Sequence, residues 1–250
     1  MKENFFMLLD KLILITGAGS GIGRETAIVV SKLGAHVVLL DVSEDGLKET
    51  ASLLMGNRFS YHVVDLTDNN AIVKIIEKIV DSNGPVSGLV HCAGVSSRKP
   101  LNVLKRDGFG NVMNVNFYAF VELVKQVTKK GRFTDGGSIV VMSSISSFRG
   151  YKAKTEYCVS KAAVDAFVRC MALELAPKRI RINSVMPGEV LTPMGLKSRE
   201  MAMMAGTQLE EAPLGPTDPS EVANLISFLL SDATKTITGT SIIIDGGATI

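Results

Sequence analysis

The sequence has few of the features that mark disulfide-bonded or metal-binding proteins. Its three cysteines, Cys92, Cys158 and Cys170, cannot all pair and fall at no metal-ligand spacing. Scarce cysteines of this kind indicate a reducing compartment, where thiols act as small hydrophobic side chains. We therefore expect a cytoplasmic protein without a metal site.

Long apolar runs and basic clusters are also missing. No apolar run is long enough to span a membrane. The apolar run 5–9 ends at Asp10 and Lys11 and has no small-residue cleavage site, so we do not expect a signal peptide. The net charge is +2, and basic residues occur singly or in short pairs such as Lys129-Lys130. We expect neither a membrane nor a nucleic acid as partner.

What is present is the composition of a globular α/β protein. The 250 residues are 46% hydrophobic and 21% charged, which suits one domain, 1–250, with a sizeable core. Strand-like apolar runs occupy 12–15, 36–40, 60–64, 88–91, 138–142, 181–185 and 241–244. Amphipathic stretches predict helices over 21–33, 43–55, 69–81, 103–129, 155–176 and 219–231. This alternation predicts a parallel sheet covered by helices on both faces.

One long stretch, 191–217, has no clear pattern and carries four methionines, among them Met203 and Met204. Irregular stretches of this length in compact domains are typically lids or disordered segments. Together with Phe148, the methionines suggest an apolar, adaptable substrate lid, although methionines at this spacing also occur simply in a core.

A glycine-rich turn, TGAGSGIG at 16–23, follows the first strand and precedes the first helix. Glycines allow the backbone to approach a pyrophosphate, and the helix offers free N–H groups and a positive dipole end. The strand before and the helix after are the context that a dinucleotide-binding motif requires. An ordinary tight turn between strand and helix is the alternative.

Two carboxylates follow the next two strands. Asp41 ends the second strand, where a carboxylate accepts hydrogen bonds from the adenosine ribose and repels a 2′-phosphate. This favours NAD over NADP. Alternatively Asp41 is a solvated loop residue or caps the next helix. Asp65, after the third strand, could contact the adenine amino group or cap the helix beyond Thr67.

Tyr157 and Lys161 lie four residues apart in the helical stretch 155–176, so they share one helix face. An ammonium one turn from a phenol favours the phenolate, and we expect the pKa of Tyr157 to fall below its usual value of about 10. Such a tyrosine can exchange a proton with an alcohol or carbonyl, and Ser143 or Ser144 at a strand end could hold the substrate oxygen. Taken alone, the pair is more often a surface tyrosine beside a solvated lysine.

Several motifs, in order along the chain, resemble those of the classical short-chain dehydrogenase/reductase family, including 3-oxoacyl-(acyl-carrier-protein) reductase-like members. They are the glycine-rich turn, Asp65-Leu66, Ala93-Gly94, Asn116, Ser144, Tyr157-x-x-x-Lys161, Pro187-Gly188 and Asp245-Gly246-Gly247. The resemblance covers nearly the whole chain. It implies a single-domain Rossmann-type fold with a doubly wound, seven-stranded parallel sheet, and a homotetramer or homodimer whose C-terminal segment packs at a subunit interface.

By the same resemblance, Tyr157 is the catalytic acid/base, and Lys161 binds the nicotinamide ribose and tunes the pKa of Tyr157. Ser144 orients the substrate oxygen, because its spacing to Tyr157 matches the family pattern better than the spacing of Ser143 does. Asn116 matches the family residue that keeps a proton-relay water beside Lys161. Without the family, Asn116 would be only a polar residue inside a helix. The residues implied to bind the cofactor are Gly17, Ser20, Gly21, Ile22, Gly23, Asp41, Asp65, Leu66, Ala93, Gly94, Tyr157, Lys161, Pro187, Gly188, Val190 and Thr192.

The chain departs from the family pattern after the fourth strand, where His91-Cys92 replaces an Asn-Asn pair. The expected contacts there are largely backbone, so cofactor binding should survive, whereas the side-chain bonds that stabilise the strand are in doubt. A reactive pair is disfavoured because adjacent strand residues face opposite ways. Pro216 stands where many members have Arg. Arg149 could select an anionic group, although a solvated loop arginine is the more common case.

These observations predict an oxidoreductase that transfers a hydride between a nicotinamide cofactor and a carbonyl or secondary alcohol, with a small molecule as substrate. One alternative is an NADPH-dependent 3-oxoacyl-(acyl-carrier-protein) reductase, against which Asp41 argues; sugars, polyols and hydroxysteroids also remain open as substrates. An alternative from another class is a non-catalytic NAD(H)-binding regulator, which would not need an intact Ser144, Tyr157 and Lys161 set.

Overall fold

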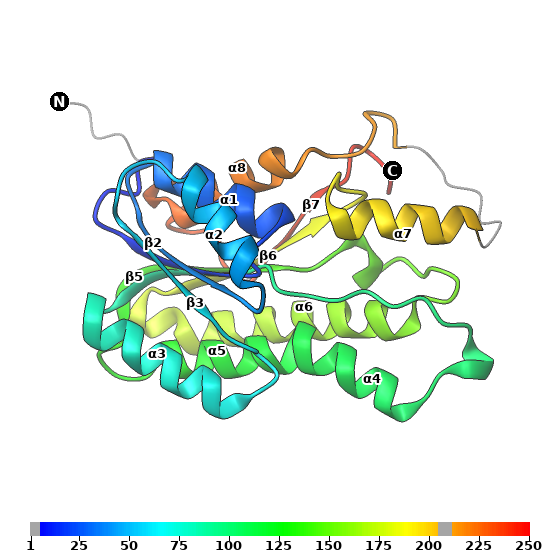
Figure 1. Ribbon diagram of the computed structural model, residues 1–250, viewed down its shortest axis with the longest axis horizontal. Coiled ribbons are helices and arrows are strands. Elements are labelled where there is room, and N and C mark those ends of the chain that lie inside the picture. The colour runs from blue at the N-terminus through cyan, green and yellow to red at the C-terminus, as the bar shows by residue number, and fades with distance from the viewer. Residues whose placement is uncertain (1–5, 205–211) are drawn as a thin grey trace.

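The computed structural model describes residues 6–204 and 212–250, which build a parallel sheet between two layers of helices (Figure 1). The sheet has seven strands in the order β3-β2-β1-β4-β5-β6-β7, and every neighbouring pair is parallel. The strands are β1 (Leu12–Thr16), β2 (His36–Asp41), β3 (Phe59–Val63), β4 (Val86–His91), β5 (Phe133–Met142), β6 (Arg181–Pro187) and β7 (Ser241–Ile244). The predicted seven-stranded parallel sheet is confirmed.

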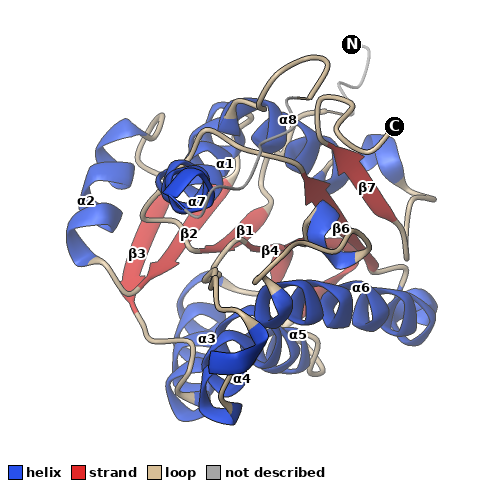
Figure 2. Cartoon of the chain, turned by 90° about the vertical axis from the view of Figure 1, so that its right-hand side faces the viewer, coloured by secondary structure: helices blue, strands red, loops and turns tan. Residues whose placement is uncertain are grey.

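Helices cover both faces of this sheet, as Figure 2 shows. One layer contains α1 (Gly21–Lys32), α2 (Glu44–Leu53) and α8 (Pro219–Leu230). The other contains α3 (Asn69–Asn83), α4 (Arg106–Met113), α5 (Ala119–Val127) and α6 (Thr155–Leu175). Alternate strand residues face the two layers: Ile13 packs toward α1 and α8, whereas Leu14 packs toward α3 and α5. The doubly wound arrangement is therefore confirmed.

The strand order reverses direction between β1 and β4, and this point fixes where a ligand can bind. In open parallel sheets, the crevice beyond the carboxyl ends of the strands at such a switch point is the usual binding site. The turns after β1, β4, β5 and β6 all open at this edge.

The predicted single helix over 103–129 is interrupted. The structure has a short turn, η1 (Leu101–Val103), then α4, a π-helical turn η2 (Asn114–Tyr118), and α5. The cause lies at Asn116, whose side chain bonds the backbone N–H and carbonyl of Val95 at 2.8 and 3.0 Å. This long-range anchor widens the helix locally, which helical periodicity cannot reveal.

The predicted irregular stretch 191–217 contains a helix, α7 (Pro193–Met204), while its part 205–211 lies outside the described residues. Thr192 starts the helix by accepting a hydrogen bond from the N–H of Gly195 at 3.1 Å, and Pro193 occupies the first helical position. Glu189 and Arg199 tie α7 to the end of β6 through contacts of 3.0 and 2.9 Å. Residues 193–204 of the stretch are therefore regular, whereas 212–217 are turns and bends that end in an isolated bridge between Thr217 and Val190.

No helix in the described ranges combines the length and the apolar character needed to cross a membrane.

Candidate active site

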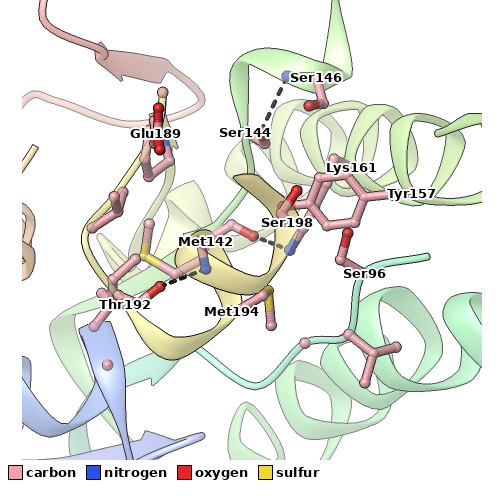
Figure 3. Close-up of a pocket in the computed structure, with 18 of the residues that line it drawn as sticks. Ser96, Met142, Ser144, Ser146, Tyr157, Lys161, Glu189, Thr192, Met194 and Ser198 are labelled. Carbon is pink, nitrogen blue, oxygen red and sulfur yellow. Dashed lines mark hydrogen bonds between the residues drawn. The ribbon is translucent and has the colours of Figure 1, made fainter. Parts of the chain in front are cut away.

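A cavity of about 1280 Å³ opens at the carboxyl edge of the sheet, between the glycine-rich turn, the ends of β4, β5 and β6, and α7. Its lining includes every residue that the sequence predicted to bind cofactor, together with Ser144, Tyr157 and Lys161. Asn116 is the exception, since it lies outside the lining. Figure 3 shows Ser144, Tyr157 and Lys161 on one side of the cavity and Thr192 and Met194 on the side of α7.

The glycine-rich turn packs against neighbouring backbone too closely for larger side chains. Gly17 has φ +66°, and a Cβ there would lie 2.6 Å from the backbone N of Ala93. A Cβ on Gly23 would collide with the carbonyl of Gly17. The turn is thus a backbone cradle at the N-terminus of α1, with the shape and the positive dipole end that suit a pyrophosphate. The residues present fit a dinucleotide.

Asp41, at the end of β2, is hydrogen-bonded to the backbone of the glycine-rich turn. Its carboxylate accepts hydrogen bonds from the N–H groups of Gly19 and Ser43, both at 2.9 Å. Ser43, and not Asp41, caps α2 by accepting from the N–H of Gly46 at 3.1 Å. Asp41 is therefore a fixed carboxylate in the cavity wall, neither a helix cap nor a freely solvated loop residue.

Asp65 also faces the cavity, and it does not cap the following helix. Its carboxylate accepts hydrogen bonds from the backbone N–H and the hydroxyl of Thr67, both at 2.8 Å, which hold the pKa of Asp65 below its usual value. Asp68 caps α3, accepting from the N–H groups of Asn70 and Ala71. The alternative that Asp65 caps this helix is wrong.

The two serines at the end of β5 have different surroundings. Ser143 is buried and donates to the Asp165 carboxylate at 2.9 Å. Ser144 lines the cavity with Tyr157, lowers the pKa of that phenol, and accepts a hydrogen bond from the N–H of Ser146 at 3.1 Å. Of the two hydroxyls, therefore, Ser144 is the one positioned beside the phenol.

Burial dominates the ionisation of Tyr157. It raises the pKa of the phenol to about 12, and the hydrogen bond with Ser144 lowers that pKa only in part. The expectation that Lys161 would bring the pKa below its usual value is wrong for the chain without ligands, because the cost of desolvating the phenolate is larger. The phenol is therefore protonated near neutral pH.

Lys161 lies one helical turn from Tyr157, with its ammonium 5.6 Å from the centre of the phenol ring. The ammonium donates to the carbonyl of Met142 at 2.7 Å, at the end of β5. Burial lowers the pKa of Lys161 to about 8, and the nearby Cys92 and Asp165 oppose this shift. The amine thus titrates close to neutral pH and sits beside both the phenol and the cradle.

Asn116 lies outside the cavity lining and is hydrogen-bonded to residues of the loop after β4 and of α6. Besides its two bonds to Val95, its amide donates to the hydroxyl of Ser160 on α6 at 3.0 Å. A Cβ on Gly94 would lie 3.3 Å from the Asn116 oxygen and 3.7 Å from the Lys161 nitrogen, so the three residues meet below the cavity. Asn116 joins the loop after β4 to the helix that carries Tyr157 and Lys161.

His91 and Cys92 are structural residues. Nδ1 of His91 lies 2.8 Å from the hydroxyl of Thr16, its register partner on β1, and its ring stacks on Phe120. The strand-stabilising side-chain bond that the sequence left in doubt is therefore present. Burial raises the pKa of the Cys92 thiol to about 12, which keeps it from forming a reactive thiolate.

Sequence reasoning missed four cations that line this cavity: Arg98, Lys152, Lys154 and Arg199. The ammonium of Lys154 lies 6.0 Å from the centre of the Tyr157 ring. Its spacing three residues before Tyr157 on the same helical turn could have indicated this contact. Arg98 reaches the cavity from the loop after β4, and no local pattern marks it.

Such a constellation can exchange a proton with a small oxygen-containing substrate. A protonated phenol, a hydroxyl in the same cavity and a nearby amine are the groups needed to place and protonate a carbonyl oxygen. The adjoining cradle can hold a phosphate-containing cofactor beside them.

Known proteins are similar to this chain over nearly its full length. A family model described as Enoyl-(Acyl carrier protein) reductase matches residues 17–249. The chain is 36% identical to a 3-oxoacyl-(acyl-carrier-protein) reductase of Thermotoga maritima over 97% of this chain and 99% of that protein. It is 34% identical to an NAD-dependent glycerol dehydrogenase of Listeria innocua over 98% of this chain and 96% of that protein.

Solved structures resemble the chain over nearly its full length. Levodione reductase superposes with a TM-score of 0.90 and 27% identity, covering 96% of this chain and 97% of that one. A dehydrogenase/reductase from Sinorhizobium meliloti superposes with a TM-score of 0.86 and 28% identity, covering 98% and 97% of the two chains.

Proposed function

Because this chain belongs to the short-chain dehydrogenase/reductase family, we propose that Tyr157, Ser144 and Lys161 carry its hydride-transfer reaction. The enzyme is an oxidoreductase that acts on a carbonyl or secondary alcohol with a nicotinamide cofactor. The observation that supports these residue roles is that Ser144 and Tyr157 line the same cavity as the glycine-rich cradle, with the Lys161 ammonium 5.6 Å from the centre of the Tyr157 ring.

In this proposal, the bound nicotinamide supplies or accepts the hydride. Ser144 holds the substrate oxygen, and Tyr157 donates its proton to that oxygen in reduction and removes it in oxidation. Lys161 stabilises the phenolate that remains after reduction. A phenol pKa of about 12 keeps the proton available near neutral pH. Asn116 supports Lys161 indirectly, through the loop after β4 and Ser160.

Steady-state turnover tests these roles. We expect the wild-type chain to oxidise NADH with members of a panel of ketones and aldehydes, and Tyr157→Phe to lose at least about a hundredfold in kcat, since general acid catalysis contributes this much. Tyr118→Phe, an exposed tyrosine, is the matched control and should behave as wild type. Cofactor binding without turnover of any carbonyl or alcohol would instead support a non-catalytic NAD(H)-binding regulator.

We propose NAD as the cofactor, with Asp41 as the selecting residue. A 2′-phosphate would face a carboxylate fixed by two backbone N–H groups, and such a like-charge contact costs several kcal/mol. The second candidate is an NADPH-dependent 3-oxoacyl-(acyl-carrier-protein) reductase, which the similarity to the 3-oxoacyl-(acyl-carrier-protein) reductase of Thermotoga maritima supports.

Asp41→Asn tests this choice, because asparagine removes the charge and can still accept the bond from Gly19. We expect the NADH over NADPH ratio of kcat/KM to fall at least about tenfold. Asp45→Asn, an exposed acid of α2 outside the cavity, is the control. A wild-type preference for NADPH would contradict the proposal and favour the second candidate.

We further propose that 191–217 forms the substrate lid of this single domain. Met194, Leu196 and Ala202 of α7 line the cavity and give the lid an apolar inner side. We also propose a homotetramer or homodimer, on the basis of the family resemblance. The free thiols Cys92, Cys158 and Cys170 support a cytoplasmic location, because reducing compartments keep cysteines unpaired. Light scattering of the purified chain and cell fractionation test these two points.

A further inference from the structure

Positive charge gathers at the substrate side of the cavity. Arg98, Arg149, Lys152 and Lys154 all line it, from the loop after β4 and from the segment between Ser144 and Tyr157. Among the described lining residues the acids are Asp41, Asp65 and Glu189. The two aspartates follow β2 and β3, on the side of the glycine-rich cradle. The substrate side therefore has more cations than acids.

Lys154 is the member of this cluster that contacts the proposed catalytic tyrosine. Its ammonium lies 5.6 Å from the centre of the Tyr151 ring and 6.0 Å from the centre of the Tyr157 ring. Arg149 lies over the other end of the cluster, 5.7 Å from the Tyr151 ring, and donates to the carbonyl of Ala248 at 2.6 Å. The cations thus surround the place where a substrate would extend away from Ser144.

Arg98 is held toward Lys154 by the backbone. The N–H of Lys99 donates to the carbonyl of Ala153 at 2.7 Å, which joins the loop after β4 to the segment before α6. The Arg98 guanidinium reaches the carbonyl of Lys152 at 3.4 Å, while its buried Nε has no hydrogen-bond partner among the described residues. Arg98 therefore lies beside the segment that carries Lys154, both side chains line the cavity, and Arg98 has an N–H group left to donate to a ligand.

The charge of this pair is poorly compensated by protein groups. Burial lowers the pKa of Lys154, and the neighbouring Arg98 lowers it further. Glu189 is the carboxylate that acts on Lys154 in the opposite sense, but it makes two contacts of 3.0 and 2.9 Å with Arg199. An arrangement of partly buried cations without its own counter-ion suits an anionic ligand.

We propose that the substrate of this enzyme carries an anionic group, a carboxylate or phosphate, that Lys154 and Arg98 bind while Ser144 and Tyr157 hold its reacting carbonyl. This inference rests on the proposed function and narrows its substrate class. Because the Lys154 ammonium lies 6.0 Å from the centre of the Tyr157 ring and Ser144 lines the same cavity, the anionic group would lie close to the reacting carbon, as in short oxo acids and phosphorylated ketones.

Matched substrate pairs test the proposal. One arm compares short oxo acids with their methyl esters, and the other compares dihydroxyacetone phosphate with dihydroxyacetone, each with NADH and the wild-type chain. We expect kcat/KM to be higher for the anion in one arm, which identifies carboxylate or phosphate. In Lys154→Met and Arg98→Met, the anion over neutral ratio should fall at least about tenfold per lost charge-assisted contact.

The ratio of kcat/KM for the anionic over the neutral substrate is the readout. A substitution that disturbs Tyr157 slows both substrates equally and therefore leaves this ratio unchanged. Lys154→Arg should retain the preference, and Lys105→Met, which removes an exposed cation outside the cavity, should leave it at the wild-type value. NADH affinity should not change in Lys154→Met, which separates a substrate site from a cofactor site.

Three outcomes would overturn the inference: turnover of neutral carbonyls at least as efficient as that of their anionic partners, a preference for anions that survives both methionine variants, or a loss of NADH affinity in Lys154→Met that matches its loss of kcat/KM. In each case turnover itself would leave the proposed function standing. Absence of turnover with any carbonyl, by contrast, would count against the proposed function itself.

Discussion

Burial, more than the pairing of charges, sets the ionisation of the residues at the centre of the cavity. It brings the pKa of Tyr157 to about 12 and that of Lys161 to about 8. The same effect brings the pKa of Cys92 to about 12. In each case the neutral form is favoured because the charged form would lose water. A bound substrate oxygen that accepts the Tyr157 proton therefore meets a proton donor in the correct state.

The buried ring of His91 should make the stability of the folded chain depend on pH. Burial lowers the pKa of His91 to about 3, so the folded chain keeps the ring neutral at a pH where the unfolded chain binds a proton. The resulting stability is fully present above pH 6.5 and is lost as the pH falls toward 3. Between pH 7 and pH 4, the free energy of unfolding of the wild type should fall by roughly 3 kcal/mol more than that of His91→Asn, because the variant lacks the titrating ring.

Urea unfolding at the two pH values measures this difference. His62→Asn is the matched control, because His62 is only half-buried and its pKa is lowered less far. An identical pH dependence for wild type and His91→Asn would show that the ring does not stay neutral in the fold.

At the scale of elements, α6 carries both Tyr157 and Lys161 and must be held firmly against the sheet. Asp165, on the same helix, accepts hydrogen bonds from the hydroxyls of Ser143 on β5 at 2.9 Å, Ser184 on β6 at 2.6 Å and Ser241 on β7 at 3.3 Å. One buried carboxylate thus holds the helix that carries Tyr157 and Lys161 against three strands.

We expect Asp165→Ala to lower the free energy of unfolding by about 3 kcal/mol, because it leaves buried hydroxyls without their acceptor. Asp165→Asn should cost less, since its amide oxygen can still accept. Glu174→Ala, on an exposed face of the same helix, is the control. Thermal and urea unfolding measure all three. A cost for Asp165→Ala no larger than that for Glu174→Ala would remove this role.

Two elements, the π-helical turn at Asn116 and the helix α7, were not predicted from the sequence. Helical periodicity predicted the start of α6 at Thr155 but not the π-helical turn at Asn116, because the cause is a bond to Val95, far away along the chain. α7 was missed because glycine, proline and methionine hide its pattern, whereas its start depends on Thr192 and its position on Glu189.

At the scale of the whole molecule, the sheet brings distant residues to one edge. Gly17 follows the first strand and Thr192 follows the sixth, yet a Cβ on Gly21 would lie 3.2 Å from the Thr192 side chain. The alternation of strands and helices predicted this edge, and the motifs predicted the glycine-rich cradle and the set of Ser144, Tyr157 and Lys161 that line it. The cation pair of Lys154 and Arg98 could not be predicted, because it depends on how two loops meet.

The central claim is that this edge unites cofactor binding with proton transfer by Tyr157. Rapid mixing of NADH-loaded protein with a ketone from the active panel follows hydride transfer in a single turnover, while a fluorescence titration measures NADH affinity in the same preparation. We predict that Tyr157→Phe binds NADH as wild type does but transfers the hydride at least about a hundredfold more slowly. Hydride transfer at the wild-type rate in Tyr157→Phe would contradict the account.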